Sequence, residues 1–196
     1  FYLIISLFMS VLTSVHERPP HFQDEGQVID TSRFVKLFER KSDGYALFRI
    51  PTMVKSTKGT LLVFSEGRLC GGPCGDGGDI NLVLKRSMDG GITWDDMIVV
   101  WDNGDNTCGN PVPIVDETTG DIHLLMSLNN KRVYTTKSDD DGLSWSVPKE
   151  ITSQVKESDW KFYATGPVHG LQIKEGKYKG RLMATAYSVI ITDDQR

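Results

Sequence analysis

Two stretches of this sequence, SMDGGITW at residues 87–94 and SDDDGLSW at residues 138–145, share the pattern S-x-D-x-G-x-[ST]-W. The second copy starts 51 residues after the first, and a weaker third start, Thr192 to Asp194, follows 54 residues later. Self-similarity at a nearly constant period of this length is typical of repeat architectures. The repeated stretch therefore predicts a chain built from similar units.

The recurring residues suit a tight turn. An Asp side chain accepts hydrogen bonds from backbone N–H groups two or more residues on, a Gly adopts the positive φ that such turns need, and a Trp packs between adjacent sheets. This predicts a structural role for the motif and no role in catalysis. The residues concerned are Ser87, Asp89, Gly91 and Trp94 in the first copy and Ser138, Asp140, Gly142 and Trp145 in the second.

Between these turns the sequence predicts short strands separated by Gly-containing turns, and no segment keeps a helical period. Four strands for every fifty or so residues is the pattern of propeller blades. We therefore expect an all-β fold with about three blades. The expected strands cover residues 33–39, 46–55, 60–65 and 80–87, then 97–101, 112–116, 121–128 and 132–138, then 149–152, 168–173, 181–187 and 189–192.

The composition is that of a soluble domain with a packed core, since 39% of the 196 residues are hydrophobic and 24% are charged. The net charge of −4 provides no basic surface for nucleic acid. It also disfavours an anionic ligand unless Arg side chains gather locally.

The first fifteen residues, FYLIISLFMSVLTSV, form one apolar run. The run is shorter than the ~20 residues of a membrane-spanning helix, and it fits the core of a secretory signal better. A buried strand or a membrane anchor is the alternative. We expect a partial signal peptide at 1–15, a linker at 16–32 and the folded domain at 33–196, in a secreted or extracellular protein with no membrane span in the mature chain, a lysosomal or membrane-attached location being the alternative.

Three cysteines, Cys70, Cys74 and Cys108, are present. Secretion permits disulfides, and the odd count leaves one thiol free or paired outside this chain. A bridge that closes the loop between Cys70 and Cys74 is one arrangement, and the pairing stays open. With little support from histidine, these residues do not form a zinc site, so no metal and no cofactor are expected.

Upstream of both repeats, residues 45–51 read YALFRIP. FRIP followed by S-x-D-x-G-x-[ST]-W repeats, which are called Asp boxes, resembles the sialidase (neuraminidase) family over residues 33–194. The resemblance implies a six-bladed β-propeller with substrate bound at one end of its central axis. About the first three blades would lie in this chain.

The resemblance further implies that Arg49 of FRIP belongs to an arginine triad that binds the carboxylate of sialic acid. A guanidinium matches a carboxylate in bidentate fashion and keeps its charge at any working pH. The alternative for Arg49 is a salt bridge within its own sheet.

The loop that follows the predicted strand 60–65 is rich in glycine, and the resemblance puts the acid/base aspartate of the family at Asp76, with Asp79 as the rival. A general acid protonates the leaving glycosidic oxygen and later activates water. The alternative for Asp76 is an aspartate that only stabilises a turn.

Three further residues match substrate-binding positions of the family. Arg68 resembles a residue near the C4 hydroxyl of the sugar, with a surface arginine as the alternative. Asn110 stands where several sialidases carry Asp, and as the residue before Pro111 it is equally explained as a turn residue. Tyr163, with Thr165 and Gly166, resembles the wall of the glycerol or aglycone side of the pocket.

The family uses a Tyr nucleophile activated by a Glu, because the carboxylate at the anomeric carbon repels a charged nucleophile. That Tyr, the Glu and two further Arg come from later blades. The resemblance therefore implies that the complete protein is a retaining exo-α-sialidase acting on sialylated glycoproteins, glycolipids or oligosaccharides, and that this chain alone is inactive. A non-catalytic sialic-acid-binding propeller and a trans-sialidase are the alternatives.

Overall fold

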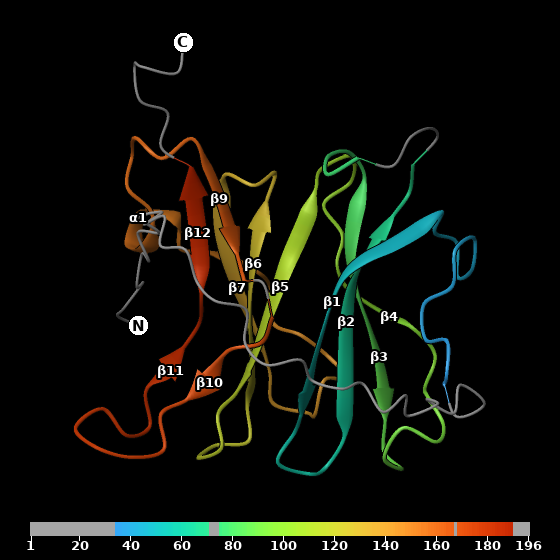
Figure 1. Ribbon diagram of the computed structural model, residues 1–196, viewed down its shortest axis with the longest axis horizontal. Coiled ribbons are helices and arrows are strands. Elements are labelled where there is room, and N and C mark those ends of the chain that lie inside the picture. Colours follow the sequence, from blue (N-terminus) through green and yellow to red (C-terminus); the bar gives the residue numbers. More distant parts are fainter. Residues whose placement is uncertain (1–33, 71–74, 167, 190–196) are drawn as a thin grey trace, which may run out of the picture.

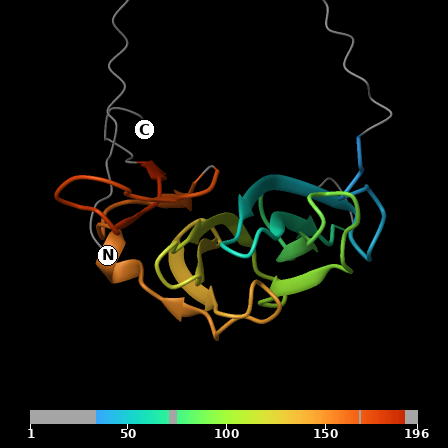
Figure 2. The same ribbon diagram turned by 90° about the horizontal axis from the view of Figure 1, so that it is seen from below.

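The computed structural model describes residues 34–70, 75–166 and 168–189. The predicted signal core and linker, residues 1–32, lie outside the described residues. Within them the chain is almost entirely β-structure, arranged as two four-stranded antiparallel sheets followed by two short two-stranded sheets (Figure 1). The sheets stand side by side when the molecule is turned by 90° (Figure 2).

The first sheet, which we call blade 1, has the strand order β1-β2-β3-β4. Blade 2 repeats the arrangement as β5-β6-β7-β8. Blade 1 consists of β1 (Leu47–Lys55), β2 (Leu61–Arg68), β3 (Ile80–Ser87) and β4 (Ile98–Trp101), and blade 2 of β5 (Cys108–Val115), β6 (Ile122–Leu128), β7 (Arg132–Ser138) and β8 (Lys149–Glu150).

The last described part, which we call hairpin 3, follows the short helix α1 (Thr152–Val155). Its strand β9 pairs with β12 and its strand β10 with β11, all antiparallel. The strands are β9 (Phe162–Thr165), β10 (Leu171–Gln172), β11 (Leu182–Met183) and β12 (Ala186–Val189). Hairpin 3 has the position of a third blade. Each arm of the hairpin is an interrupted strand, one formed by β9 and β10 and the other by β11 and β12.

The all-β prediction is confirmed, but the predicted grouping of strands is wrong by one. Residues 34–39, expected to begin blade 1, are not in a strand. The strand expected to open blade 2, β4, is instead the outer strand of blade 1. The reason is that each Asp box closes the turn between the third and fourth strands of a blade, and does not separate one blade from the next. The structure also adds β9 and α1, which the prediction lacked.

The core lies between the blades. Strands β2 and β6 alternate between faces, so that Leu62 and Phe64 of blade 1 and Leu124 and Met126 of blade 2 are completely buried in one shared cluster. Full burial of such side chains contributes ~1.5–3 kcal/mol each. A second cluster lies between blade 2 and hairpin 3 and includes Val112, Ile114, Leu125 and Tyr163. Blade 2 is therefore held on both faces.

Both Asp-box turns are closed by the predicted side chains. In the first, Oδ1 of Asp89 accepts hydrogen bonds from the N–H groups of Ile92 and Thr93 at 3.1 and 2.9 Å, and Oδ2 accepts from the Thr93 hydroxyl at 2.6 Å. The Ser87 hydroxyl donates to Asp89 and accepts from Gly91 N–H, both at 2.8 Å. The turn is thus a local structure that the eight-residue motif contains entirely.

The second turn repeats these bonds with Ser138, Asp140, Gly142 and Ser144. It also touches blade 1, because the ring of Trp145 packs edge-on against Phe64 with centroids 5.7 Å apart. The second Asp box therefore joins two blades as well as closing its own hairpin.

Candidate active site

Arg49 lies where strand β1 is interrupted. The register of β1 against β2 shifts between Arg49 and Thr52, and Ile50 has a φ of 54°. A β-branched residue in this left-handed region is a genuine outlier, and such strain costs ~1–3 kcal/mol and gathers at functional sites. Strand β5 has the same irregularity at Asn110, with a φ of 58°. In both strands the strained residue immediately precedes a proline.

Arg49 and Asp76 meet at this bulge. Nη1 of Arg49 donates to Oδ1 of Asp76 at 2.8 Å. The Arg49 side chain is 47% exposed and that of Asp76 73% exposed, so a ligand from solvent can reach both. The pairing brings together the two residues that the sequence singled out for carboxylate binding and for acid/base chemistry.

Arg68 donates to the same oxygen from the protein interior. Its Nη1 donates to Oδ1 of Asp76 at 2.9 Å and to the carbonyl of Gly75, although Arg68 itself is only 3% exposed. Two guanidinium groups, one accessible and one buried, therefore converge on one carboxylate oxygen. The alternative for Arg68, a surface arginine, does not describe this buried side chain.

Glu66 is a member of the cluster that sequence reasoning missed. Its side chain is 4% exposed, and Oε2 accepts from Nη2 and Nε of Arg68 at 2.5 and 3.2 Å. Oε1 accepts the backbone N–H of Asn110 at 3.0 Å. A Cβ at Gly109 would lie 2.6 Å from Oε1, so the close approach of blade 2 requires glycine there. Glu66 thus couples Arg68 to the bulge of the neighbouring blade.

Asn110 is turned toward its own blade and hairpin 3. Its Nδ2 donates to Oγ of Ser127 at 2.8 Å and to Oδ1 of Asn130 at 2.7 Å, while its carbonyl accepts the Thr165 hydroxyl at 2.5 Å. An aspartate could not donate these two bonds. The amide is therefore what the surrounding acceptors require, and Asn110 is more than a turn residue.

Asp79, the rival acid/base candidate, has a different position. Its backbone carbonyl accepts the N–H of Leu69 at 3.0 Å, which closes the base of the loop between β2 and β3. Among the described residues, no ion pair includes Asp79, whereas Asp76 pairs with both arginines. The geometry favours Asp76 of the two.

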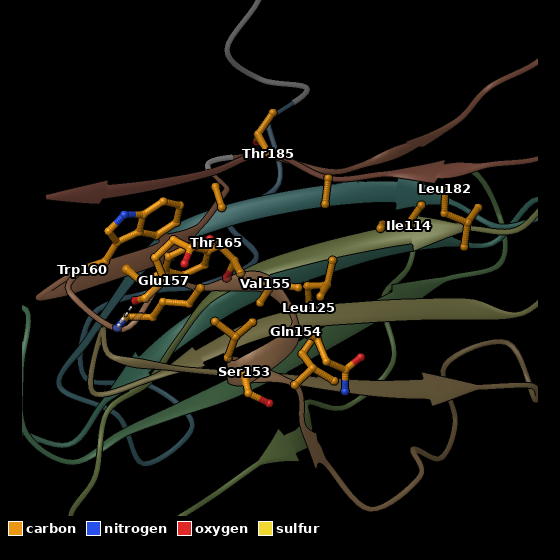
Figure 3. Close-up of a pocket in the computed structure, with 16 residues that line it drawn as sticks. Ile114, Leu125, Ser153, Gln154, Val155, Glu157, Trp160, Thr165, Leu182 and Thr185 are labelled. Carbon is orange, nitrogen blue, oxygen red and sulfur yellow. Dashed lines mark hydrogen bonds between the residues drawn. The ribbon is translucent and has the colours of Figure 1, made fainter. Parts of the chain in front are cut away.

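Tyr163 does not lie with this cluster. It is 2% exposed, it stacks on Trp160 with centroids 5.8 Å apart, and burial raises the pKa of its phenol to about 12. It lines a separate cavity of ≈ 520 Å³ between blade 2 and hairpin 3, with Trp160 near one end and Leu182 near the other (Figure 3). None of Arg49, Arg68 or Asp76 lines this cavity. The structure therefore associates Tyr163 with packing.

Of the cysteines, Cys70 is disulfide-bonded, and Cys108 is free and buried. Burial raises the pKa of the Cys108 thiol to about 12. Cys74 lies outside the described residues. In the part of the chain that the structure describes, no group of three His, Cys, Asp or Glu residues is arranged to hold a metal ion, and no helix is long and apolar enough to cross a membrane.

A family model of the BNR repeat-like domain matches residues 59–195 of this chain. The chain belongs to the sialidase (BNR repeat) family. An exo-alpha-sialidase of Aspergillus fumigatus is 32% identical over 167 residues, which cover 68% of this chain and 40% of the relative. Human sialidase-4 is 30% identical over 175 residues, which cover 78% of this chain and 34% of the relative.

Solved structures of sialidases share the fold of this family member. A Hadza microbial sialidase is 27% identical with a TM-score of 0.68, covering 76% of this chain and 34% of the other. A leech intramolecular trans-sialidase, 16% identical with a TM-score of 0.65, supports the fold alone. The structure is therefore part of a sialidase β-propeller, and the chain spans about 40% of the length of the fungal relative that it matches.

Proposed function

We propose that the complete protein is a retaining exo-α-sialidase that removes terminal sialic acid from glycoproteins, glycolipids or oligosaccharides. One observation carries the proposal: the guanidinium groups of Arg49 and Arg68 converge at 2.8 and 2.9 Å on a single exposed carboxylate, Asp76. The two arginines form an anion-binding site, and the carboxyl group of Asp76 lies at its edge. Those are the two features that hydrolysis of an acidic sugar needs from this part of the molecule.

In this proposal Arg49 binds the carboxylate of the sugar. The side chain is half-exposed and its Nη1 already holds a carboxylate oxygen, that of Asp76. A bound sialic acid would compete with Asp76 for this guanidinium, since both present the same charge and shape. Substrate binding then frees the Asp76 carboxyl to turn toward the glycosidic oxygen, which it protonates as general acid before it activates water.

Arg68 and Asn110 are proposed to complete this part of the substrate site. We assign Arg68 to the region of the C4 hydroxyl, where its orientation is set by Glu66 below it. Asn110 lies one hydrogen bond from Glu66 and presents no negative charge to the acidic sugar. No metal or cofactor has a role in the proposed reaction.

The nucleophile and the rest of the arginine triad are proposed to come from later blades. A Tyr activated by a Glu, together with two further Arg, would face Arg49 across the central axis. Residues 1–196 alone are therefore expected to be inactive. We also propose that the apolar run at 1–15 directs the protein to secretion, where its sialylated substrates are found.

The test is hydrolysis of an α-linked sialoside by the full-length protein. Arg49→Ala should raise KM by tenfold or more, because a charge-assisted bidentate contact contributes ~1.5–3 kcal/mol. Asp76→Asn should lower kcat by about 10²-fold or more, the loss expected of a missing general acid. Asp79→Asn is the matched control, since its carboxylate forms no ion pair among the described residues.

An unchanged rate for Asp76→Asn, or an equal loss for Asp79→Asn, would refute the assignment of the acid. Retained binding of sialic acid by a full-length protein without hydrolysis would show a lectin in place of an enzyme.

A further inference from the structure

The turn between β6 and β7 has asparagine at two consecutive positions of positive φ, Asn129 and Asn130. Asn129 and Asn130 both have positive φ, 53° and 51°, and Lys131 N–H donates to the carbonyl of Leu128 at 3.1 Å. Two consecutive residues of positive φ are typical of a type I′ turn, for which Asn-Gly is the preferred pair. Glycine adopts positive φ more easily than asparagine. Contacts of the Asn130 side chain outside the turn can account for asparagine at this position.

Asn130 touches three parts of the molecule at once. Its Oδ1 accepts Nδ2 of Asn110 at 2.7 Å in blade 2, and its backbone carbonyl accepts the N–H of Tyr163 at 2.8 Å in hairpin 3. Its Nδ2 donates to the backbone carbonyl of Asp76 at 3.4 Å, which belongs to the loop between β2 and β3 of blade 1. Glycine could provide only the second of these contacts.

We propose that Asn130 is a positioning residue that holds the Asp76 loop over the two arginines. The inference rests on the proposed function, because it gives Asp76 the role of acid/base. Asn130 holds the backbone of Asp76 and leaves both carboxyl oxygens unoccupied by that contact. It acts through Asp76 and does not itself touch the reacting atoms.

The need for such an anchor follows from the other contacts of Asp76. In the free protein its carboxylate is held by Arg49 and Arg68. A bound sialic acid takes the Arg49 guanidinium, so one of these two attachments is lost at the moment when the acid must be placed. The bond from Asn130 is independent of the carboxylate and persists. A small displacement of a catalytic group is costly, since ~1 Å can lower a rate by about 10²-fold.

The test uses full-length Asn130→Gly and its neighbour Asn129→Gly as the matched control. Both variants remove one side chain from the same turn and keep the positive φ. Among the described residues, the Asn129 side chain bonds to Asn106 and Thr107: its Nδ2 donates to Oδ1 of Asn106 at 2.8 Å, and its Oδ1 accepts the N–H of Thr107 at 2.9 Å. Thermal unfolding of each variant confirms that it is folded.

The readout is kcat on two substrates that differ in the leaving group. A sialyl-sugar leaves as a poorly acidic alcohol and needs full protonation, whereas a nitrophenyl sialoside leaves without it. Asn130→Gly should lower kcat about tenfold on the sialyl-sugar and less than about threefold on the nitrophenyl substrate, with KM nearly unchanged, a displacement effect within the range for a misplaced group. Asn129→Gly should behave as wild type.

A purely structural Asn130 predicts the opposite, because glycine suits the turn and activity on both substrates would be retained or lost equally. Either result overturns the proposal. Asn130→Asp separates the two side-chain bonds: it still accepts from Asn110 and cannot donate to Asp76, so it should be as slow as Asn130→Gly. Full activity of Asn130→Asp would also contradict the proposal. Wild-type protein without hydrolytic activity would instead refute the proposed function itself.

Discussion

Glu66 and Arg68 show at the scale of single residues how the site is made rigid. Both side chains are almost inaccessible, and both carboxylate oxygens of Glu66 are hydrogen-bonded: Oε2 accepts from two N–H groups of Arg68, and Oε1 accepts from the N–H of Asn110. A buried charge is costly unless it is paired and hydrogen-bonded. The pair therefore has one low-energy arrangement, and that arrangement directs Nη1 of Arg68 at Asp76.

Removal of one member should be severe. Among the described residues, Glu66→Ala leaves the buried guanidinium of Arg68 with the exposed Asp76 as its one carboxylate partner, and we expect the free energy of unfolding to fall by about 3 kcal/mol or more. Urea denaturation of the full-length variant measures the loss. Glu39→Ala is the control, because its pair with Lys36 is 62% and 79% exposed and should change stability by less than about 1 kcal/mol. Equal effects of the two variants would contradict this account of Glu66.

The two Asp boxes share one sequence motif but pack differently against their neighbouring strands. Both turns are closed by the same Ser and Asp hydrogen bonds, yet the glycines differ in surroundings. At Gly91 a Cβ would make ordinary contacts at 3.6 Å with Leu61 and 3.7 Å with Trp94. At Gly142 a Cβ would lie 2.4 Å from Cδ2 of Leu62 in the neighbouring blade. Identical motif positions therefore serve a turn alone in one blade and a contact between blades in the next.

A matched pair of substitutions separates these roles. Gly91→Ala and Gly142→Ala share the cost of a positive φ, which is 94° and 84°, a strain of ~1–2 kcal/mol. Only Gly142→Ala adds overpacking of a closed core, worth another ~1–3 kcal/mol. Thermal or urea unfolding should therefore show Gly142→Ala as clearly the less stable variant, and equal stabilities would be inconsistent with the packing described here.

The Asp-box carboxylates, Asp89 and Asp140, make the stability of the fold depend on pH. Hydrogen bonds from the Thr93 side chain, and then from other groups of the turn, lower the pKa of Asp89 to about 2; at Asp140 burial acts to raise the pKa, but bonds from Ser144 and Ser138 outweigh it and lower the value to about 2. A depressed folded-state pKa stabilises the fold above the unfolded value of 3.8 and the benefit disappears as pH falls toward 2.

Unfolding followed by circular dichroism should thus show falling stability between about pH 4 and pH 2. The Asp89→Asn, Asp140→Asn double variant should be less stable at neutral pH and should lose less of its remaining stability across that window. A double variant with the same pH dependence as wild type would contradict the assignment.

Asp141 shows at the scale of the whole molecule how the blades are joined. Its Oδ2 accepts the Thr60 hydroxyl at 2.6 Å and lies 3.5 Å from Nη2 of Arg86, and its carbonyl accepts Nε of Arg86 at 2.9 Å. Thr60 and Arg86 belong to blade 1, whereas Asp141 belongs to the second Asp box. This polar contact lies at the end of blade 1 away from the active site, because Arg86 pairs with Leu62 near the start of β2, whereas Arg68 ends that strand and pairs with Ile80.

The contact between blades should appear as coupling in a double-mutant cycle of Thr60→Val and Asp141→Ala. A hydrogen bond to a charged group contributes ~1.5–3 kcal/mol, so the two changes together should cost about that much less than the sum of their separate costs. The cycle compares the unfolding free energies of the full-length wild type, the two single variants and the double variant. Additive costs would mean that the 2.6 Å contact contributes nothing to stability.

Features that depend on a local pattern can be predicted from the sequence. The Asp boxes, the all-β class and strands such as β3 and β7 follow from turn chemistry and alternation within a few consecutive residues, and the FRIP motif led directly to Arg49. Two further sequence features correspond to local structure. A residue followed by proline stands at the irregularities of β1 and β5, and two consecutive asparagines, residues common in turns of positive φ, connect β6 and β7.

The folded structure was needed to show which blade each strand joins, that Arg49 and Arg68 share Asp76, and that Tyr163 lies in the core. These outcomes rest on contacts between residues far apart in sequence, such as Glu66 with Asn110 and Asn130 with Asp76. A buried carboxylate cannot be told from a surface one in the sequence, because its hydrogen-bond donors can come from another blade. The identity of a residue sets what it can bond, and the packing of the sheets sets which partner it meets.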